Sequence, residues 1–287
     1  GPEVNAYTSF EETVYKLEVP ADKPDYLEQA MLIFHDWASA VTFDPEELEK
    51  ERGVVLEEWR GSLGLNGRLV DAVLPFELKD SPFVDRLPIG KPEVIQNISR
   101  DEVVNFYKKW YQPHNMAVIV SGVVDPKVAE WLIKNAMGSI PAAQEKHVLA
   151  KGKVPVQTQK DLLVFADPEL TFTQVQIISQ DEDNKPCQTQ GDLRRTYLTN
   201  LVNNIFNSRL YEITSTPEAP WLAANAVRYN ETNTTAFNGY YFVPKEGYFS
   251  QAFQTMLDET DRLLLHGITE SEFSRAKESL LTTENQW

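Results

Sequence analysis

Two glutamates with the spacing of one helical face are the residues of this chain best suited to chemistry. Glu51 and Glu58 lie seven positions apart. In a helix turning about 100° and rising about 1.5 Å per residue, their side chains would differ by roughly 20° around the axis and lie about 10 Å apart along it. Carboxylates on such a face can bind a metal ion, and a catalytic zinc takes three protein ligands and keeps one position for water.

The remaining ligands of such a zinc site would usually be histidines. The chain has four, which are His35, His114, His147 and His266. None of them begins His-x-x-Glu-His or His-Glu-x-x-His, the two spacings that place a pair of ligands on one helical face. The sequence therefore supplies at most the second half of a zinc site.

The helix that carries the two glutamates has clear start signals. Asp44 can cap it, Pro45 suits its first position, and Glu47 follows the cap as in a capping box. Because Val54, Val55 and Leu56 surround the stripe, we expect at least one of Glu51 and Glu58 to be drawn toward the interior. The alternative is an ordinary charged helix whose glutamates pair in water with Lys50, Arg52 and Arg60.

A second candidate for function is the N-terminal strand. Tyr15, Leu17 and Val19 alternate with Lys16 and Glu18, which predicts a strand with one buried face and one wet face. An unpaired strand edge offers N–H and C=O groups that can accept an extended peptide as one more strand. The alternative is an interior strand with no role in binding.

Periodicity along the chain predicts an α+β fold with two related domains, each a mostly antiparallel sheet with helices packed on one face. Helices are expected at 25–40, 44–63, 68–78, shortly before 99, at 101–111, 125–136 and 192–213, and in two final segments. Strands are expected at 115–123, 162–165, 172–179, 221–228 and 236–243. We expect a first domain at 1–140, a linker at 141–160 rich in Lys, Gln and Pro, and a second domain at 161–287.

Composition excludes several classes of protein. With 43 acidic and 27 basic residues, the net charge of −16 argues against nucleic acid as a partner and suits cationic peptides. The single cysteine, Cys187, excludes an internal disulfide framework and a cysteine-rich zinc finger. Apolar runs are too short for a membrane span, which needs about 20 such residues.

Several separated stretches together resemble pitrilysin/insulinase-type zinc metallopeptidases, the inverzincins. In chain order they are Asn5 to Tyr15, Asp44 to Arg60, Pro88-Ile89-Gly90 with Ile95, Phe106 to Gly122, Ser208-Arg209-Leu210, and Gly267 to Glu270 with Phe273 and Ala276-Lys277. Each stretch alone is weak, but their order and spacing cover nearly the whole chain.

The resemblance implies roles for particular residues. Glu58 would be the third zinc ligand and Glu51 a nearby acid that supports the site by orienting a metal-bound histidine. Asn5, Ala6 and Tyr7 would contact the peptide substrate. The His-x-x-Glu-His helix of the family would fall before Gly1, so we expect no catalytic residue, no peptidase activity and poor zinc binding in the chain as printed.

For the intact protein the resemblance implies a zinc-dependent endopeptidase that cleaves extended or unfolded peptides. Residues 1–140 would be the C-terminal part of the zinc-binding domain, and residues 161–287 a non-catalytic, C-terminally truncated one. Donors for the oxyanion would come from a second half of the polypeptide or a homologous subunit. For a bacterial source the periplasm is favoured. The alternative is a non-catalytic homologue that serves as a scaffold or as the pairing subunit of a two-part peptidase.

Overall fold

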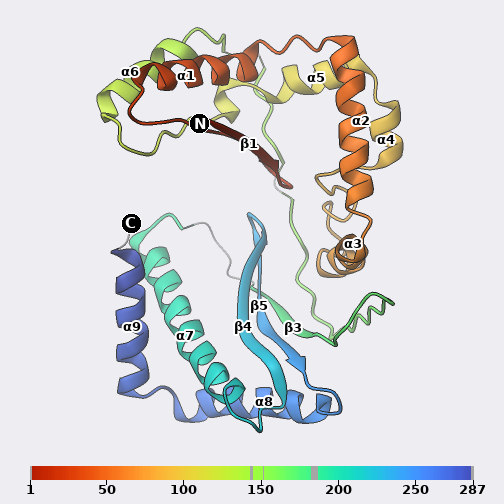
Figure 1. Cartoon of the computed structure of the whole chain (residues 1–287), viewed down its shortest axis with the longest axis vertical. Coiled ribbons are helices and arrows are strands. Elements are labelled where there is room, and N and C mark those ends of the chain that lie inside the picture. The colour runs from red at the N-terminus through yellow and green to blue at the C-terminus, as the bar shows by residue number, and fades with distance from the viewer. Residues whose placement is uncertain (1, 143–144, 151, 182–186, 286–287) are drawn as a thin grey trace. The chain divides into compact units, whose positions relative to one another are not determined.

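The structure is a computed structural model that describes residues 2–142, 145–150, 152–181 and 187–285. It divides into two compact units (Figure 1). The first comprises residues 1–71 and 82–151, and the second comprises residues 72–81 and 152–287. The expected C-terminal truncation of the second domain concerns residue 287, which lies outside the described residues.

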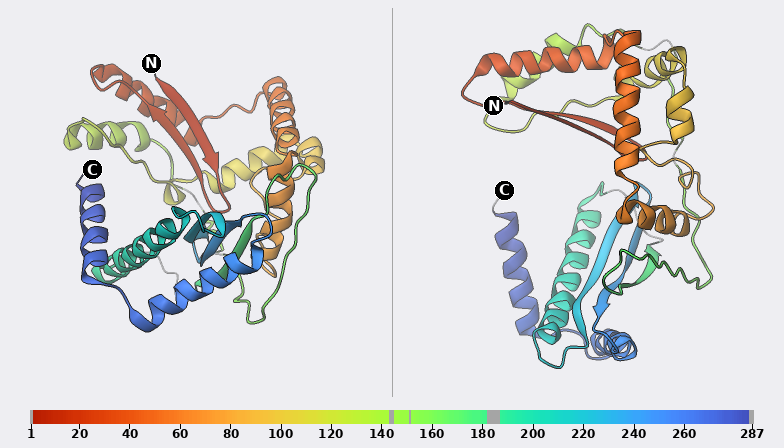
Figure 2. Two further views of the ribbon diagram at one scale, coloured as in Figure 1. Left: turned by 60° about the horizontal axis from the view of Figure 1, so that its bottom comes forward. Right: turned by 45° about the vertical axis from the view of Figure 1, so that its right-hand side comes forward.

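The first unit is mainly helical. It contains β1 (Glu3–Thr8), β2 (Thr13–Glu18), α1 (Pro24–Ser39), α2 (Pro45–Gly61), α4 (Pro92–Asn97), α5 (Arg100–Trp110), the 3-10 turn η1 (Pro113–Asn115) and α6 (Pro126–Met137). Helix α1 packs on α6, and α2 on α4 (Figures 1 and 2). Strands β1 and β2 form a two-stranded antiparallel hairpin.

The helix starts of this unit follow from capping side chains. Asp44 accepts from two backbone amides at the start of α2, as predicted. Ser99 and Glu102 form a reciprocal capping box on α5, and Asp125 accepts from the Lys127 amide at the start of α6. Each of these side chains satisfies backbone donors that have no partner inside the helix.

The second unit is a three-stranded antiparallel sheet covered by helices. Its strands are β3 (Val175–Asp181), β4 (Trp221–Thr232) and β5 (Thr235–Pro244), in the order β3-β5-β4. Its helices are α7 (Gln190–Thr214), α8 (Phe249–His266) and α9 (Glu270–Glu284). Helix α7 packs on β4, α8 contacts β5, and α9 packs on α7. The predicted α+β class with antiparallel sheets is confirmed.

The core of the second unit lies between this sheet and helices α7 and α8. Its buried members are Phe206, Leu210, Trp221, Ala224, Phe242, Ala252 and Met256. Burial of apolar area at about 25 cal/mol per Å² is the main stabilising term for such a cluster. The indole N–H of Trp221 donates to Thr214 Oγ1 at 2.8 Å, so the one polar atom of that ring is satisfied.

Helix α3 (Leu65–Glu77) begins in the first unit, and its last turn belongs to the second. There the Tyr229 hydroxyl donates to Glu77 Oε1 at 2.8 Å. Burial raises the pKa of Glu77, while the bond from Tyr229 opposes that shift and nearby Glu231 adds to it. The last turn of α3 is thus held to β4 through a buried carboxyl.

Two predicted strands are wrong. Residues 116–123 form no strand, and Ile119 and Val123 are 85% and 91% exposed. Residues 162–165 also form no strand, with Leu162 and Val164 largely exposed. A strand needs a neighbouring backbone to pair with, and within the described residues neither segment has one.

Candidate functional site

Helix α2 forms as its sequence predicts at the N-terminus. Asp44 Oδ1 accepts from the amides of Glu46 and Glu47 at 2.9 and 3.2 Å, and Pro45 occupies the first turn. The reciprocal half of the expected capping box does not form, because Glu47 Oε1 instead accepts from Lys50 Nζ at 2.5 Å. The helix start therefore depends on the single cap.

Arg52 fixes α2 against α4. Its guanidinium donates to the carbonyl oxygens of Ile95 and Ile98, and it also pairs with Glu49. The Arg52 side chain is only 15% exposed, so this charge is satisfied inside the unit. The contact holds the orientation of the helix that carries Glu51 and Glu58.

Glu51 and Glu58 are both exposed, so the expectation that at least one of them points inward is wrong. Helix α2 buries none of its residues, and even Val54 is 57% exposed. Val55 and Leu56 are half-buried, so within the described residues the apolar side chains around the stripe are only partly covered.

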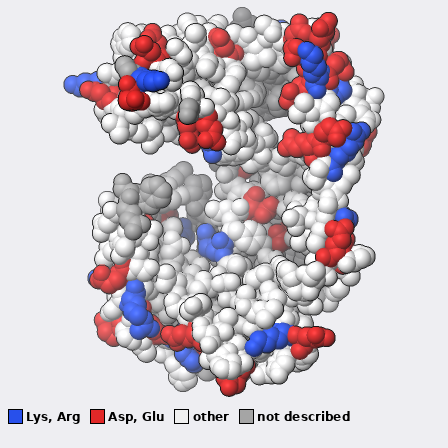
Figure 3. All heavy atoms as spheres, in the orientation of Figure 1, with Lys and Arg blue, Asp and Glu red and all other residues white. Residues whose placement is uncertain are grey.

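The three basic residues of α2 pair with other glutamates. Lys50 pairs with Glu47, Arg52 with Glu49 and Arg60 with Glu57. Among the described residues, the carboxylates of Glu51 and Glu58 make no hydrogen bond or ion pair, and neither does that of Glu46. Acidic side chains gather around α2 with basic ones among them (Figure 3). The ion pairs expected of an ordinary charged helix therefore form, but they do not involve Glu51 or Glu58.

The described residues do not bring together a complete metal site. No group of three or more histidine, cysteine, aspartate or glutamate side chains within them could hold a metal ion. His35 contacts Asp36, its helical neighbour, His114 contacts the carbonyl of His147, and His266 ends α8. Glu58 is an accessible carboxylate, and Glu51 lies on the same stripe of α2.

The predicted peptide-binding residues lie on β1. Asn5, Ala6 and Tyr7 are exposed, and in the described part of the chain β1 pairs only with β2. One edge of β1 is therefore without a strand. The Ala6 amide donates to Asn5 Oδ1 at 2.8 Å, so a peptide that used this amide would have to displace the Asn5 side chain.

Tyr7 is held within the hairpin. Its hydroxyl donates to Glu12 Oε1 at 3.0 Å, and this bond is the main reason why the pKa of Tyr7 is raised. Lys16 Nζ lies 4.9 Å from the centre of the Tyr7 ring. The face of the hairpin that carries Asn5 and Tyr7 is thus polar, as a substrate-contacting surface in water would be.

Sequence reasoning missed the aromatic side chains that attach this hairpin to the helices. Tyr15 of β2 contacts Trp37 of α1 and Tyr111 at the end of α5. The available signal in the sequence is the Trp110-Tyr111 pair, which lies in a stretch that resembles the family but has no role implied by it. Only the folded chain brings residues so distant in sequence together.

Comparison with known families matches two parts of the chain. Residues 97–280 match the family described as Peptidase M16 inactive domain. Residues 1–63 match the family described as Insulinase (Peptidase family M16). The second match contains both Glu51 and Glu58, together with the β1–β2 hairpin.

Named relatives agree with these matches. A probable zinc protease PqqL from Escherichia coli is 42% identical over 142 residues, which are 50% of this chain and 15% of that protein. A zinc protease PQQL-like from Arabidopsis thaliana is 33% identical over 226 residues, which are 78% of this chain and 24% of that protein. The chain thus spans less than a quarter of the length of these relatives.

Solved structures share the fold. The first half of the periplasmic protease PqqL from Escherichia coli superposes with a TM-score of 0.86 at 28% identity, covering 99% of this chain and 60% of that one. A peptidase M16 inactive domain from Pseudomonas fluorescens, at 15% identity and a TM-score of 0.73 over 98% of this chain and 66% of that one, shows the fold alone. The chain belongs to the M16 (insulinase) peptidase family.

Proposed function

We propose that this chain is part of a zinc-dependent metalloendopeptidase that hydrolyses peptide bonds in extended or unfolded peptides. The observation that carries the proposal is Glu58, an exposed carboxylate that no cation within the described residues engages, in a segment that matches the insulinase family. Relatives of the same family that are named zinc proteases support the choice of zinc as the metal.

In this proposal Glu58 supplies one zinc ligand and Glu51 orients a neighbouring ligand from outside the printed chain. When bound, the zinc would lower the pKa of its water and polarise the substrate carbonyl. The residues of this chain would otherwise bind and orient. Asn5, Ala6 and Tyr7 of β1 would hold the peptide extended, with affinity that comes mainly from backbone hydrogen bonds.

The chain as printed would be inactive and would bind zinc poorly, because one carboxylate falls short of the three protein ligands of a catalytic zinc site. Its partners would be peptide substrates and either a second half of the same polypeptide or a homologous subunit. A periplasmic location is proposed from the described location of the Escherichia coli relative.

A second candidate is a non-catalytic scaffold or pairing subunit. It is favoured by the match of residues 97–280 to the inactive domain of the family. That match covers most of the second unit and the end of the first, but not α2. Glu51 and Glu58 therefore lie in the part of the chain for which a catalytic role remains the better proposal.

The test uses the natural full-length protein on an unfolded, fluorescently labelled peptide. Glu58→Gln should lower cleavage by at least 100-fold and reduce the zinc content per molecule, since it removes a ligand. Glu51→Gln should cost about 10–100-fold. Glu57→Gln, on the same helix and paired with Arg60, is the matched control and should leave both quantities unchanged.

If a chelator and Glu58→Gln both leave cleavage at the wild-type rate, the metal assignment is wrong. If the full-length protein neither binds zinc nor cleaves peptides, the scaffold candidate is favoured instead.

A further inference from the structure

Aromatic side chains attach the β1–β2 hairpin to the first unit. It pairs with no other strand in the described part of the chain, so its position depends on side-chain contacts. One contact is at the turn, where the centre of the Phe10 ring lies 5.2 Å from the centre of the Phe83 ring. Phe83 is only 4% exposed. A further contact is at Tyr15, in the middle of β2.

Tyr15 reaches two helices at once. The centre of its ring lies 5.3 Å from the centre of the Trp37 ring on α1. Its hydroxyl oxygen lies 2.6 Å from the hydroxyl oxygen of Tyr111, the C-cap residue of α5. A hydroxyl pair at this distance is a well-formed hydrogen bond, and it joins segments 96 residues apart in sequence.

Tyr111 is itself held in place. The centre of its ring lies 4.5 Å from the centre of the Tyr107 ring. The Tyr107 hydroxyl in turn donates to the Trp37 carbonyl at 2.8 Å. Burial is the main cause that raises the pKa of Tyr111, and the bond with Tyr15 adds to it. Tyr111 therefore stays protonated through the neutral and mildly alkaline range, and the hydroxyl pair persists there.

The register of the hairpin carries this anchor to the candidate peptide-binding strand. Tyr15 is the pairing partner of Ala6. Residues directly opposite in an antiparallel pair have their side chains on the same face, with Cβ atoms about 5 Å apart. A movement of Tyr15 is thus transmitted to the position on β1 that is proposed to lie against the peptide.

We propose that Tyr15 and Tyr111 are positioning residues for the peptidase reaction. The hydrogen bond between their hydroxyl groups holds the free edge of β1 in the position that receives an extended peptide. The inference rests on the proposed function. Neither residue touches the peptide. A phenylalanine at either position would preserve most of the ring packing and remove only the bond that fixes β2 to the end of α5.

The test compares Tyr15→Phe, Tyr111→Phe and the double variant in the natural full-length protein. Loss of one hydrogen bond, typically worth about 1 kcal/mol, corresponds to about a five-fold change. We expect KM for an extended peptide to rise about five-fold with kcat changed less than two-fold. Amide hydrogens of β1 and β2 should exchange about five-fold faster.

The double variant gives a sharper criterion. Because both substitutions remove the same bond, it should resemble either single variant rather than their sum. Tyr211→Phe is the matched control, since Tyr211 lies on α7 and is 71% exposed. It should change neither KM nor hairpin exchange.

Failure of the inference can be told from failure of the proposed function. Zinc-dependent cleavage that is sensitive to Glu58→Gln, with KM unchanged in both Phe variants, overturns the positioning role even if the hairpin exchanges faster. Wild-type protein without cleavage overturns the proposed function and the positioning role together. A higher KM without faster exchange also overturns the inference, because the hairpin would then not have been released.

Discussion

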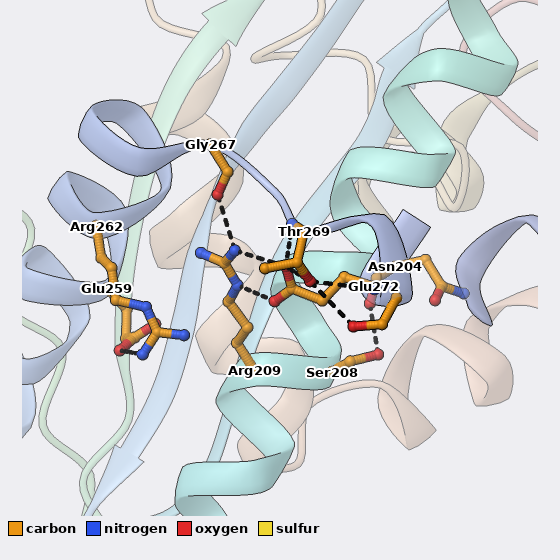
Figure 4. A network of polar contacts seen from close by, with 9 residues as sticks. Asn204, Ser208, Arg209, Glu259, Arg262, Gly267, Thr269 and Glu272 are labelled. Carbon is orange, nitrogen blue, oxygen red and sulfur yellow. Dashed lines mark hydrogen bonds and ion pairs between the residues drawn. The ribbon is translucent and has the colours of Figure 1, made fainter. Parts of the chain in front are cut away.

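The ion pair between Arg209 on α7 and Glu272 on α9 should be a main stabilising contact of the second unit (Figure 4). Arg209 Nε and Nη2 donate to the two oxygens of Glu272 at 2.6 and 3.0 Å, and Nη2 also donates to the Gly267 carbonyl at 2.9 Å. Glu272 further accepts from the Thr269 amide and hydroxyl. The side chains of Arg209 and Glu272 are only 6% and 14% exposed.

The cost of breaking this pair follows from its burial. The bond from Arg209 is the main cause that lowers the pKa of Glu272 from 4.5 to about 2. That shift, to which the bonds from Thr269 also contribute, corresponds to roughly 3 kcal/mol as an upper value for the pair. It agrees with the 3–5 kcal/mol that is roughly typical when one partner of a buried pair is removed and the other charge is left alone. We therefore expect Arg209→Met and Glu272→Gln each to cost about 3 kcal/mol, and the double variant to cost clearly less than their sum.

Because the chain has two units, the measurement should report on the second one. Hydrogen exchange of α7, α8 and α9 peptides, read by mass spectrometry across a urea series, gives the free energy of opening for that unit. The matched control is Arg195→Met, also on α7, whose ion pair with Asp192 is half exposed at Arg195. It should cost no more than about 1 kcal/mol.

The same pair sets an acid dependence. The pKa of Glu272 is depressed in the folded state, so its contribution is fully present above about pH 4.5 and is lost as the pH falls toward about 2. The difference between wild type and Arg209→Met should shrink over that window. If Arg209→Met costs no more than Arg195→Met at neutral pH, the assignment of this contact as a main source of stability is refuted.

Three further substitutions have definite expectations. A Cβ on Gly239 of β5 would lie 1.9 Å from the Ile177 carbonyl oxygen on β3. Because the backbone of the sheet must then shift, Gly239→Ala should cost at least about 2 kcal/mol in the same exchange measurement. An unchanged free energy of opening would contradict the close approach of these strands. Met256 is 0% exposed in the core of the second unit, and Met256→Ala should cost about 2–5 kcal/mol through the cavity that it leaves. Ser99→Ala removes the cap of α5 and should cost about 0.5–2 kcal/mol, seen as faster exchange confined to the first turn of that helix.

Local signals allowed much of the helical structure to be predicted. Asp44, Ser99 and Asp125 mark helix starts that the structure contains, because a cap acts on amides within three residues of itself. The segments 115–123 and 162–165 failed as strands for the opposite reason. Their apolar alternation is local, but a strand exists only where a distant backbone pairs with it.

The same distinction applies to the candidate sites. The common stripe of Glu51 and Glu58 follows from helix geometry alone, whereas their exposure depends on what packs on α2. The bond between Tyr15 and Tyr111 and the pair of Arg209 with Glu272 could not be derived from spacing, since their partners lie 96 and 63 residues apart. The stretches that resemble the family include Tyr15, Tyr111 and Arg209 but not Glu272, and they gave no role to any of these residues.

Because Glu58 is exposed, its carboxylate could bind a metal ion without first overcoming a penalty from burial. A carboxylate buried among apolar side chains without a partner is penalised in its charged form, whereas a zinc ligand must be charged and accessible. A carboxylate already paired with arginine or lysine would have to give up that partner to bind a metal. Arg60 is engaged by Glu57 instead, so within the described residues a metal at Glu58 would displace only water. The contrast between Glu58→Gln and Glu57→Gln therefore separates metal binding from general helix electrostatics, since both substitutions remove one exposed negative charge from the same turn of α2.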